Sequence, residues 1–329
     1  MCIKEQKHLF KVIAEKIRDH VGLTFTVCEL LNISENSAYR RIRGETELSF
    51  SELLLLCRTY NISMDDIINS KSNQNVLFRY APVDFAQPDS YCAYIKRLCE
   101  SLKFYKSANE IEISITAQDI PFFYFLDYPE LMFFKLYAWN DTVSRTQISY
   151  NKFCDNLDKK TIIPIYNQMA NAWQQIPSKE IWTNQTCETI LRLLEYYNEI
   201  GAFEKKETVL FLLNQLSKLM NDVNKNACDG NKGGVRKTPF HLYLCNVEFE
   251  NNFMLIKREG KMSCTIRLFT VNSILTEHED LCSETKKWID DLISKSALIS
   301  SAAVRERMWF FNSSNSKIAG LINKIDKQI

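Results

Sequence analysis

The sequence predicts a mainly α (α+β) fold, with an N-terminal five-helix bundle followed by a larger helical domain that contains a small antiparallel β-sheet. Three observations support this prediction. Short apolar stripes at helical spacing, separated by residues typical of tight turns, run from residue 3 to about residue 68. The segment "NSKSNQN" (69–75) is polar and aperiodic, as linkers are. Beyond it, alternating runs typical of strands are few. We therefore predict domains at 1–72 and 73–329.

The helices of the first domain are predicted from their start and stop signals. Residues 3–19 carry an apolar stripe at helical spacing. A hydroxyl residue followed three positions later by an acidic one has the spacing of a capping box, and it occurs three times, as Thr26 with Glu29, Ser49 with Glu52, and Ser63 with Asp66. Ser34 is predicted to cap a further helix that runs to Arg43, and Gly44 to end it in a left-handed conformation.

The second domain is predicted to be mostly helical. Helices are expected at 89–107, three times between 162 and 223, at 278–295 and twice more before the C-terminus. The helical run has no convincing fixed period, which argues against a solenoid. Residues 110–116, "EIEISIT", alternate as a strand does. After a loop at 224–239, "ENN" and "REGK" separate three strand-like runs, so a small antiparallel meander is expected there.

Composition excludes several classes of function. The 329 residues include 41 Lys and Arg against 40 Asp and Glu, so no global field draws the chain to nucleic acid or membrane. Eleven scattered cysteines without a C-x-x-C pair are typical of a reducing compartment. No signal sequence and no long apolar stretch occur, so a cytoplasmic protein without a membrane partner is expected. The four histidines lie outside any catalytic or metal-binding motif, so we predict no enzyme, no cofactor and no metal.

The stretch "ENSAYRRIRG" (35–44) is the most informative part of the chain. If Ala38 and Ile42 face inward, the opposite face presents a mixture suited to a DNA major groove. That face holds Asn36, Arg40 and Arg43, with Ser37 and Tyr39 beside them and Arg41 on the flank. Arginines at the end of a helix also complement its dipole. The same pattern therefore leaves open a domain that makes only protein contacts.

Residues 3 to about 70 resemble the Cro/lambda-repressor-like helix-turn-helix domain of bacterial regulators. The matching segments are "TVCELLNIS", "ENSAYRRIRG" and "LSFSELLLLCRTYNISMDDI". The resemblance implies that Glu35, Asn36, Tyr39 and Arg40 contact bases. Arg41 departs from the family, which usually buries an apolar residue there, so either the helix is rotated or Arg41 reaches a phosphate. The predicted DNA-binding set is Thr26, Ser34, Glu35, Asn36, Ser37, Tyr39, Arg40, Arg41 and Arg43.

An aromatic stretch in the second domain is the other candidate site. Nine of the eighteen residues from Phe122 to Trp139 are aromatic, and Pro121 and Pro129 are expected to break any long helix. Such residues either fill a core or form a ligand pocket or a dimer face. The possible effector or dimer surface is Phe122, Phe123, Phe133, Phe134, Tyr137 and Trp139.

These observations together predict a one-component transcriptional regulator. Its first domain would bind double-stranded DNA, and its second would form a homodimer, sense an unknown effector ligand, or do both. Two recognition helices about one DNA turn apart, roughly 34 Å, would be needed for specificity. The alternative is an adaptor that binds a protein or peptide through the helical second domain.

Overall fold

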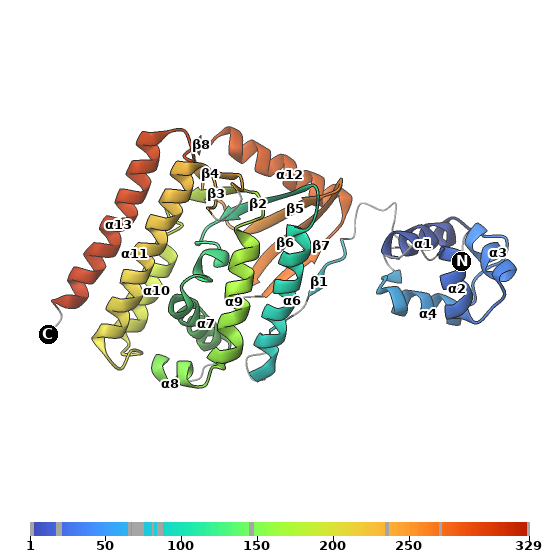
Figure 1. Ribbon diagram of the computed structural model, residues 1–329, viewed down its shortest axis with the longest axis horizontal. Helices are drawn as coiled ribbons and strands as arrows, with labels where there is room; N and C mark the ends of the chain where they lie inside the picture. The colour runs from blue at the N-terminus through green and yellow to red at the C-terminus, as the bar shows by residue number, and fades with distance from the viewer. Residues whose placement is uncertain are drawn as a thin grey trace. The chain divides into compact units, whose positions relative to one another are not determined.

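The chain forms two compact units. The computed structural model describes residues 3–17, 22–64, 67, 76–80, 82–83, 88–144, 148–233, 237–269 and 272–327. The units are Met1–Leu77 and Phe78–Ile329, and each is described by itself (Figure 1). The predicted boundary after residue 72, with the whole of the predicted linker (69–75), lies outside the described residues.

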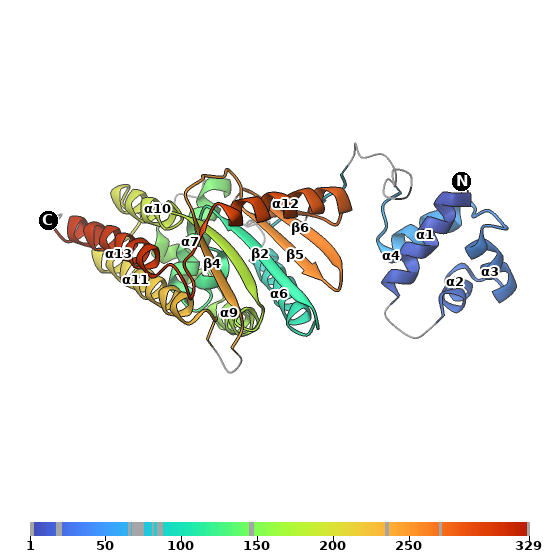
Figure 2. The ribbon, with the colours of Figure 1, turned by 90° about the horizontal axis from the view of Figure 1, so that it is seen from above.

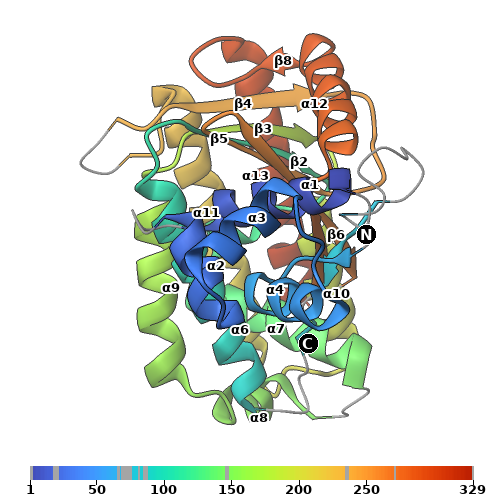
Figure 3. The ribbon, with the colours of Figure 1, turned by 90° about the vertical axis from the view of Figure 1, so that its right-hand side faces the viewer.

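The first unit is a helical bundle around a small apolar core. Its helices are α1 (Ile3–Lys16), α2 (Leu23–Leu31), α3 (Glu35–Arg43) and α4 (Phe50–Tyr60), drawn in blue in Figure 3. Leu9 and Ile13 of α1 meet Val27, Ala38 and Leu56 from the other three helices, all fully buried. The predicted fifth helix, from residue 63, lies partly outside the described residues.

The predicted caps at Ser34, Gly44 and Ser49 are present, and the predicted box of Ser63 with Asp66 lies partly outside the described residues. Ser49 and Glu52 form a capping box in which the Ser49 Oγ accepts from the Glu52 N–H at 3.3 Å. The prediction for Thr26 is wrong, because α2 starts three residues earlier after Gly22. Thr26 instead lies inside the helix, and its hydroxyl donates to the Gly22 carbonyl at 3.4 Å. A side chain in the first turns of a helix can bond back to the preceding turn in this way.

The second unit is built on a mixed eight-stranded sheet, which corrects the predicted fold class. The strand order is β1-β7-β6-β5-β2-β3-β4-β8. Strands β2, β3 and β4 are parallel, and the remaining pairs are antiparallel. The strands are β1 (Arg79–Tyr80), β2 (Ile111–Ala117), β3 (Ser178–Thr183), β4 (Phe240–Cys245), β5 (Phe253–Arg258), β6 (Lys261–Phe269), β7 (Asn272–Thr276) and β8 (Ala297–Leu298).

The predicted meander is displaced by one strand. β4 does not pair with β5 but lies between β3 and β8, and the antiparallel meander is β5-β6-β7. Glu259 and Gly260 form the turn between β5 and β6, both with positive φ. β5 pairs with β2, so the predicted strand at 110–116 joins the parallel strands to the meander in one sheet. The sheet is therefore the framework of the unit, and not an addition to a helical domain.

Helices cover both faces of this sheet. They are α6 (Pro88–Lys106), α7 (Pro129–Ser144), α8 (Tyr150–Asp155), α9 (Lys159–Trp173), α10 (Glu188–Glu199), α11 (Lys206–Asp229), α12 (Glu279–Ser294) and α13 (Val304–Asp326). Ile113, Trp182 and Leu242 face the large core formed with α6, α7, α9, α10, α11 and α13. Ile181 and Cys245 face α12 on the opposite side (Figure 2). The segment after α12 forms β8 and one long helix, where two helices were predicted.

The aromatic stretch belongs to the large core, so its predicted role as an effector or dimer surface is not supported by its position. Residues Phe122–Phe125 form a short 3₁₀ helix, and Pro129 occupies the first turn of α7, where proline is favourable, and does not break a helix. Phe123, Phe133, Phe134 and Tyr137 are buried in the core of this unit, and Phe122 and Trp139 are half-buried against it.

Candidate nucleic-acid interface

Helix α3 is fixed at both ends by its own sequence. The Ser34 Oγ accepts from the Ser37 N–H at 3.3 Å, and Gly44 ends the helix with φ of 75°. Asn32, with φ of 50°, makes the tight turn between α2 and α3 in a left-handed conformation that asparagine tolerates. Ala38 is fully buried, which turns the opposite side of α3 to solvent.

The outward face of α3 carries the residues predicted to contact bases. Glu35, Asn36, Tyr39, Arg40 and Arg43 are all exposed. The Arg43 guanidinium lies 5.3 Å from the centre of the Tyr39 ring, and its Nη1 is 3.6 Å from a carboxylate oxygen of exposed Glu45. Exposed contacts of this kind contribute little free energy and exchange readily for contacts with a ligand. The structure therefore brings these side chains together on one accessible surface.

Arg41 is engaged within the protein and is not free to reach sideways. Its Nη2 lies 3.0 Å from Glu52 Oε1 on α4, and its Nη1 donates to the Ser37 carbonyl at 3.3 Å. Burial raises the pKa of Glu52, but its bonds to Ser49 and Arg41 outweigh this effect and hold that pKa below its ordinary value. The ion pair explains how an arginine fits at this half-buried position. Arg41 thus fastens α3 to α4.

Gln6 fixes the segment that follows α3. This buried α1 side chain donates from Nε2 to the Arg41 carbonyl at 2.6 Å and to the Thr46 carbonyl at 2.8 Å. Its Oε1 accepts from the Leu48 N–H at 3.1 Å. One amide therefore pairs the Thr46 carbonyl and the Leu48 N–H, and adds a second bond to the Arg41 carbonyl, which also accepts from the Gly44 N–H at 3.0 Å. The end of α3 is held rigid relative to α1.

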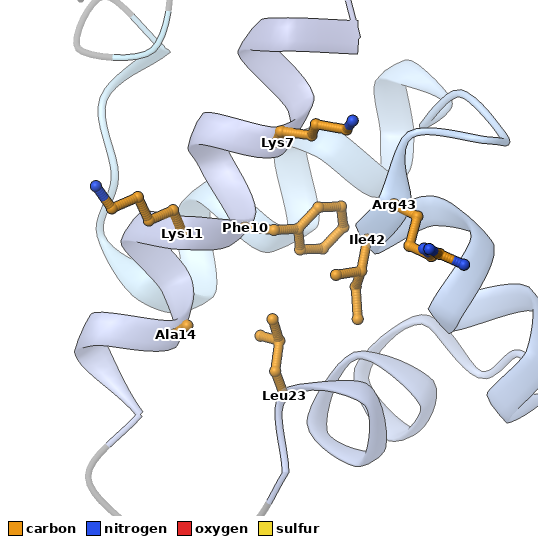
Figure 4. Close-up of a pocket in the computed structure, with 7 residues that line it drawn as sticks. All are labelled: Lys7, Phe10, Lys11, Ala14, Leu23, Ile42 and Arg43. Carbon is orange, nitrogen blue, oxygen red and sulfur yellow. The ribbon is translucent and has the colours of Figure 1, made fainter.

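Two further cations, which the sequence analysis missed, lie next to α3. A pocket of about 370 Å³ between α1, α2 and α3 is lined by Lys7, Phe10, Lys11, Ala14, Leu23, Ile42 and Arg43. Figure 4 shows its apolar side chains between Lys11 on one side and Arg43 on the other. The lining contains three cationic residues and no acidic one. The spacing of Lys7 and Lys11, four apart on one helix face, was the available signal.

The two other predicted residues lie at the edge of this surface. Ser37 is half-buried and its hydroxyl accepts from or donates to the Ser34 hydroxyl at 2.9 Å. Thr26 is half-buried on α2. Both hydroxyls already have a partner in the protein, so they contribute less accessible hydrogen-bonding capacity than Asn36 or Arg40.

The other findings bear on the remaining classes of function. Within the described residues, no group of three or more His, Cys, Asp or Glu side chains is placed to hold a metal ion. None of the described helices is both long enough and apolar enough to cross a bilayer. Comparison of the chain with family models, with characterised proteins and with solved structures finds no match.

Proposed function

We propose that the first unit binds double-stranded DNA, with the outward face of α3 in the major groove. The observation that carries this proposal is that the three arginines of α3 differ in their pairing and exposure. Arg41 is paired inside the unit, whereas Arg40 and Arg43 stand exposed beside Asn36 and Tyr39. If the arginines only complemented the helix dipole, there would be no reason for one to be paired internally while the other two stay exposed.

Each exposed side chain has a partner in duplex DNA that its chemistry suits. A guanidinium forms two parallel hydrogen bonds with guanine, and an asparagine amide does so with adenine. Arg40 and Asn36 are the side chains that would read bases in this way. Lys7 and Lys11 supply positive charge beside the end of α3, where they would neutralise phosphates and raise affinity for any sequence.

The proposal extends to a one-component regulator in the cytoplasm. One α3 makes too few base contacts for a specific site, so two copies of the chain would bind half-sites about one DNA turn apart. The second unit would hold the two copies together or respond to an effector.

The test is selection of a binding site followed by measurement of affinity. Full-length protein is used to enrich duplexes from a randomised pool, and fluorescence anisotropy gives the affinity for the enriched site at several salt concentrations. Arg40→Ala should cost about 1–3 kcal/mol and relax the preference at one base pair. Asn36→Ala should relax another.

Arg58→Ala is the matched control, because it removes an exposed arginine from α4 of the same unit. It should leave affinity for the selected site nearly unchanged. Failure to enrich any sequence, or equal losses in Arg40→Ala and Arg58→Ala, would contradict the proposal.

A further inference from the structure

A groove in the second unit lies between α12 and the segment that follows β4. Its volume is about 480 Å³, and its lining is Val247, Glu248, Phe249, Glu250, Asn251, Phe253, Leu281, Glu284, Thr285, Trp288 and Leu292. It therefore opens at the carboxyl end of a parallel strand, where ligand sites of α/β sheets commonly occur.

The wall contributed by α12 is a continuous stripe. Leu281, Thr285, Trp288 and Leu292 follow each other at intervals of three or four residues, and so share one side of the helix. Leu281 and Trp288 are half-buried, whereas Thr285 and Leu292 are buried, so the accessible part of the stripe runs from Leu281 to Trp288. It is roughly 10 Å long at the rise of an α-helix, which matches about three residues of extended chain or two turns of a second helix.

The opposite wall is held in place by β2. The Gln118 side chain donates to the Phe249 carbonyl, and the Thr116 hydroxyl donates to the Asn251 carbonyl at 3.2 Å. The Gln118 N–H donates to Asn252 Oδ1 at 2.7 Å. The segment is thus fastened to the centre of the sheet. A groove with fixed walls loses little freedom when it is occupied.

Aromatic rings form the base of the groove. Half-buried Trp288 packs edge-on with Phe253 at a centroid distance of 5.2 Å, and with buried Phe249 at 6.2 Å. Indole is the aromatic ring that attracts cations most strongly. The base can therefore hold an apolar side chain, a cation, or both at once.

The charge of the groove has one sign. Its lining includes Glu248, Glu250 and Glu284 and no Lys, Arg or His, and all three glutamates are exposed. None of them forms an ion pair within the described part of the chain, whereas Glu188, Glu195 and Glu199 of α10 are each paired with a lysine. The groove thus presents uncompensated negative charge around an aromatic base.

We propose that this groove binds a short cationic peptide segment of another protein. An apolar or aromatic side chain of the segment lies against Trp288, and its Lys or Arg side chains face the three glutamates. The length of the stripe and the open form of the groove fit a segment of chain better than a compact small molecule. The negative charge repels nucleic acid, so this site is separate from the DNA-binding face and does not depend on it.

The test uses two synthetic peptides of the same length and apolar pattern. One is KKLLKWLKKLLK, and the other carries Glu in place of every Lys. Isothermal titration with the full-length chain should show binding of the cationic peptide, weakened by salt, and none of the acidic one. Combined Glu250→Lys and Glu284→Lys should weaken binding at least tenfold. Both residues are exposed, so the variant should fold normally, which circular dichroism checks.

The matched control is Glu306→Lys, which makes the same change of charge at an exposed position on α13. It should leave the affinity within about twofold, whereas Trp288→Leu should reduce it. No binding of the cationic peptide, or equal losses in Glu306→Lys and in the groove variant, would overturn the proposal. So would binding of phenethylammonium as tight as that of the peptide, because the site would then take a small organic cation.

Discussion

The two units differ in whether they bury charged side chains. Among the described residues of the first unit, the only buried polar side chain is the uncharged Gln6. The second unit buries Asp119, Lys135, Glu180 and Lys232, all less than one-tenth exposed. A buried charge is held by its neighbours and is unavailable to a partner, whereas an exposed one is free to bind. The contrast is therefore between exposed charges, which are available to a partner, and the buried charges of the second unit, which hold its elements together.

The buried pair near the end of β2 illustrates the second unit. Lys135 Nζ lies 2.5 Å from Asp119 Oδ2, and Arg267 Nη1 lies 3.5 Å from the same oxygen. Burial lowers the pKa of Lys135, and Asp119 opposes this effect. The Lys135 ammonium also lies 4.9 Å from the centre of the Phe125 ring. The pair thus ties α7 to the carboxyl end of β2.

Two further buried charges are Glu180 of β3 and Lys232, which follows α11. Glu180 accepts hydrogen bonds from the Tyr124 hydroxyl at 2.8 Å and from the Ser178 hydroxyl at 2.9 Å. Burial raises its pKa. Burial also lowers the pKa of Lys232 to about 7, against the attraction of Glu180. The Lys232 ammonium lies over the ring of Trp173. The buried amine of Lys232, between α11 and β4, is therefore close to losing its proton at neutral pH.

The largest expected effect comes from breaking the buried pair of Asp119 and Lys135. Asp119→Asn leaves the Lys135 ammonium buried without its carboxylate and should lower the free energy of unfolding by about 3–5 kcal/mol. All five tryptophans lie in the second unit, so tryptophan fluorescence during urea unfolding reports on this unit alone. Asp119→Leu combined with Lys135→Met should recover most of the loss. A single variant as stable as wild type would show that the pair does not matter.

Gln6 offers the corresponding test in the first unit. Gln6→Ala removes the partners of the Thr46 carbonyl and the Leu48 N–H, as well as one of the two bonds to the Arg41 carbonyl, and should cost roughly 2–4 kcal/mol of stability. Hydrogen exchange of the full chain, read by mass spectrometry, should show faster exchange in α3 and in residues 44–48. Lys4→Ala, at an exposed position on α1, is the control. The tryptophan transition should not move; a shift there would mean that the two units are not independent in stability.

Lys232 predicts a pH dependence that is confined to the second unit. Between pH 7 and about 10 the unfolded amine binds a proton and the folded one does not, so Lys232 contributes stability that rises with pH, which is read as the difference between wild type and Lys232→Met. The expected slope is roughly 1 kcal/mol per pH unit. Tryptophan-detected urea unfolding at a series of pH values measures it. Lys232→Met should remove the rise, and Lys218→Met, on the exposed side of α11, should retain it. Parallel curves for all three proteins would refute the assignment.

The smallest expected effect distinguishes a true capping box from an apparent one. Ser49→Ala removes a cap of α4 and should cost about 1 kcal/mol. Thr26→Ala should change stability by less than about 0.5 kcal/mol, because Thr26 lies inside α2. Thermal melting, monitored by hydrogen exchange of the first unit, compares the stabilities of the two variants. A larger loss of stability in Thr26→Ala than in Ser49→Ala would instead support the capping box predicted at Thr26.

The helices of the first unit could be predicted from the sequence because their caps act on neighbouring residues. Ser34, Gly44 and the Ser49 box act on neighbouring residues, so their spacing alone indicates what they do. The same spacing at Thr26 was misleading, because a threonine and a glutamate three apart also occur inside a helix. The role of Arg41 was hidden for a different reason. Its partner Glu52 belongs to another helix, and only the packing of α3 on α4 brings them together.

The sequence of the second unit did not reveal which strands pair, because the partners lie far apart along the chain. β3 reads "SKEIWT", in which Ser178 and Glu180 look exposed but are buried with hydrogen bonds to each other. Its strand character depends on β2 and β4, which lie far away in the sequence. Pro129 was read as a helix breaker, although it begins α7. Trp288 lies in the helix predicted at 278–295, yet the groove beside it needs the segment after β4.

Photocrosslinking can show whether the outward face of α3 lies against duplex DNA, as we propose. p-Benzoylphenylalanine is placed at Tyr39, which is half exposed on α3, and separately at Thr59, exposed on α4. Each full-length protein is irradiated with the selected duplex. We expect a crosslink from position 39 to bases within the site, lost at high salt, and little or none from position 59. A bound duplex that crosslinks equally from both positions, or only from position 59, would contradict it.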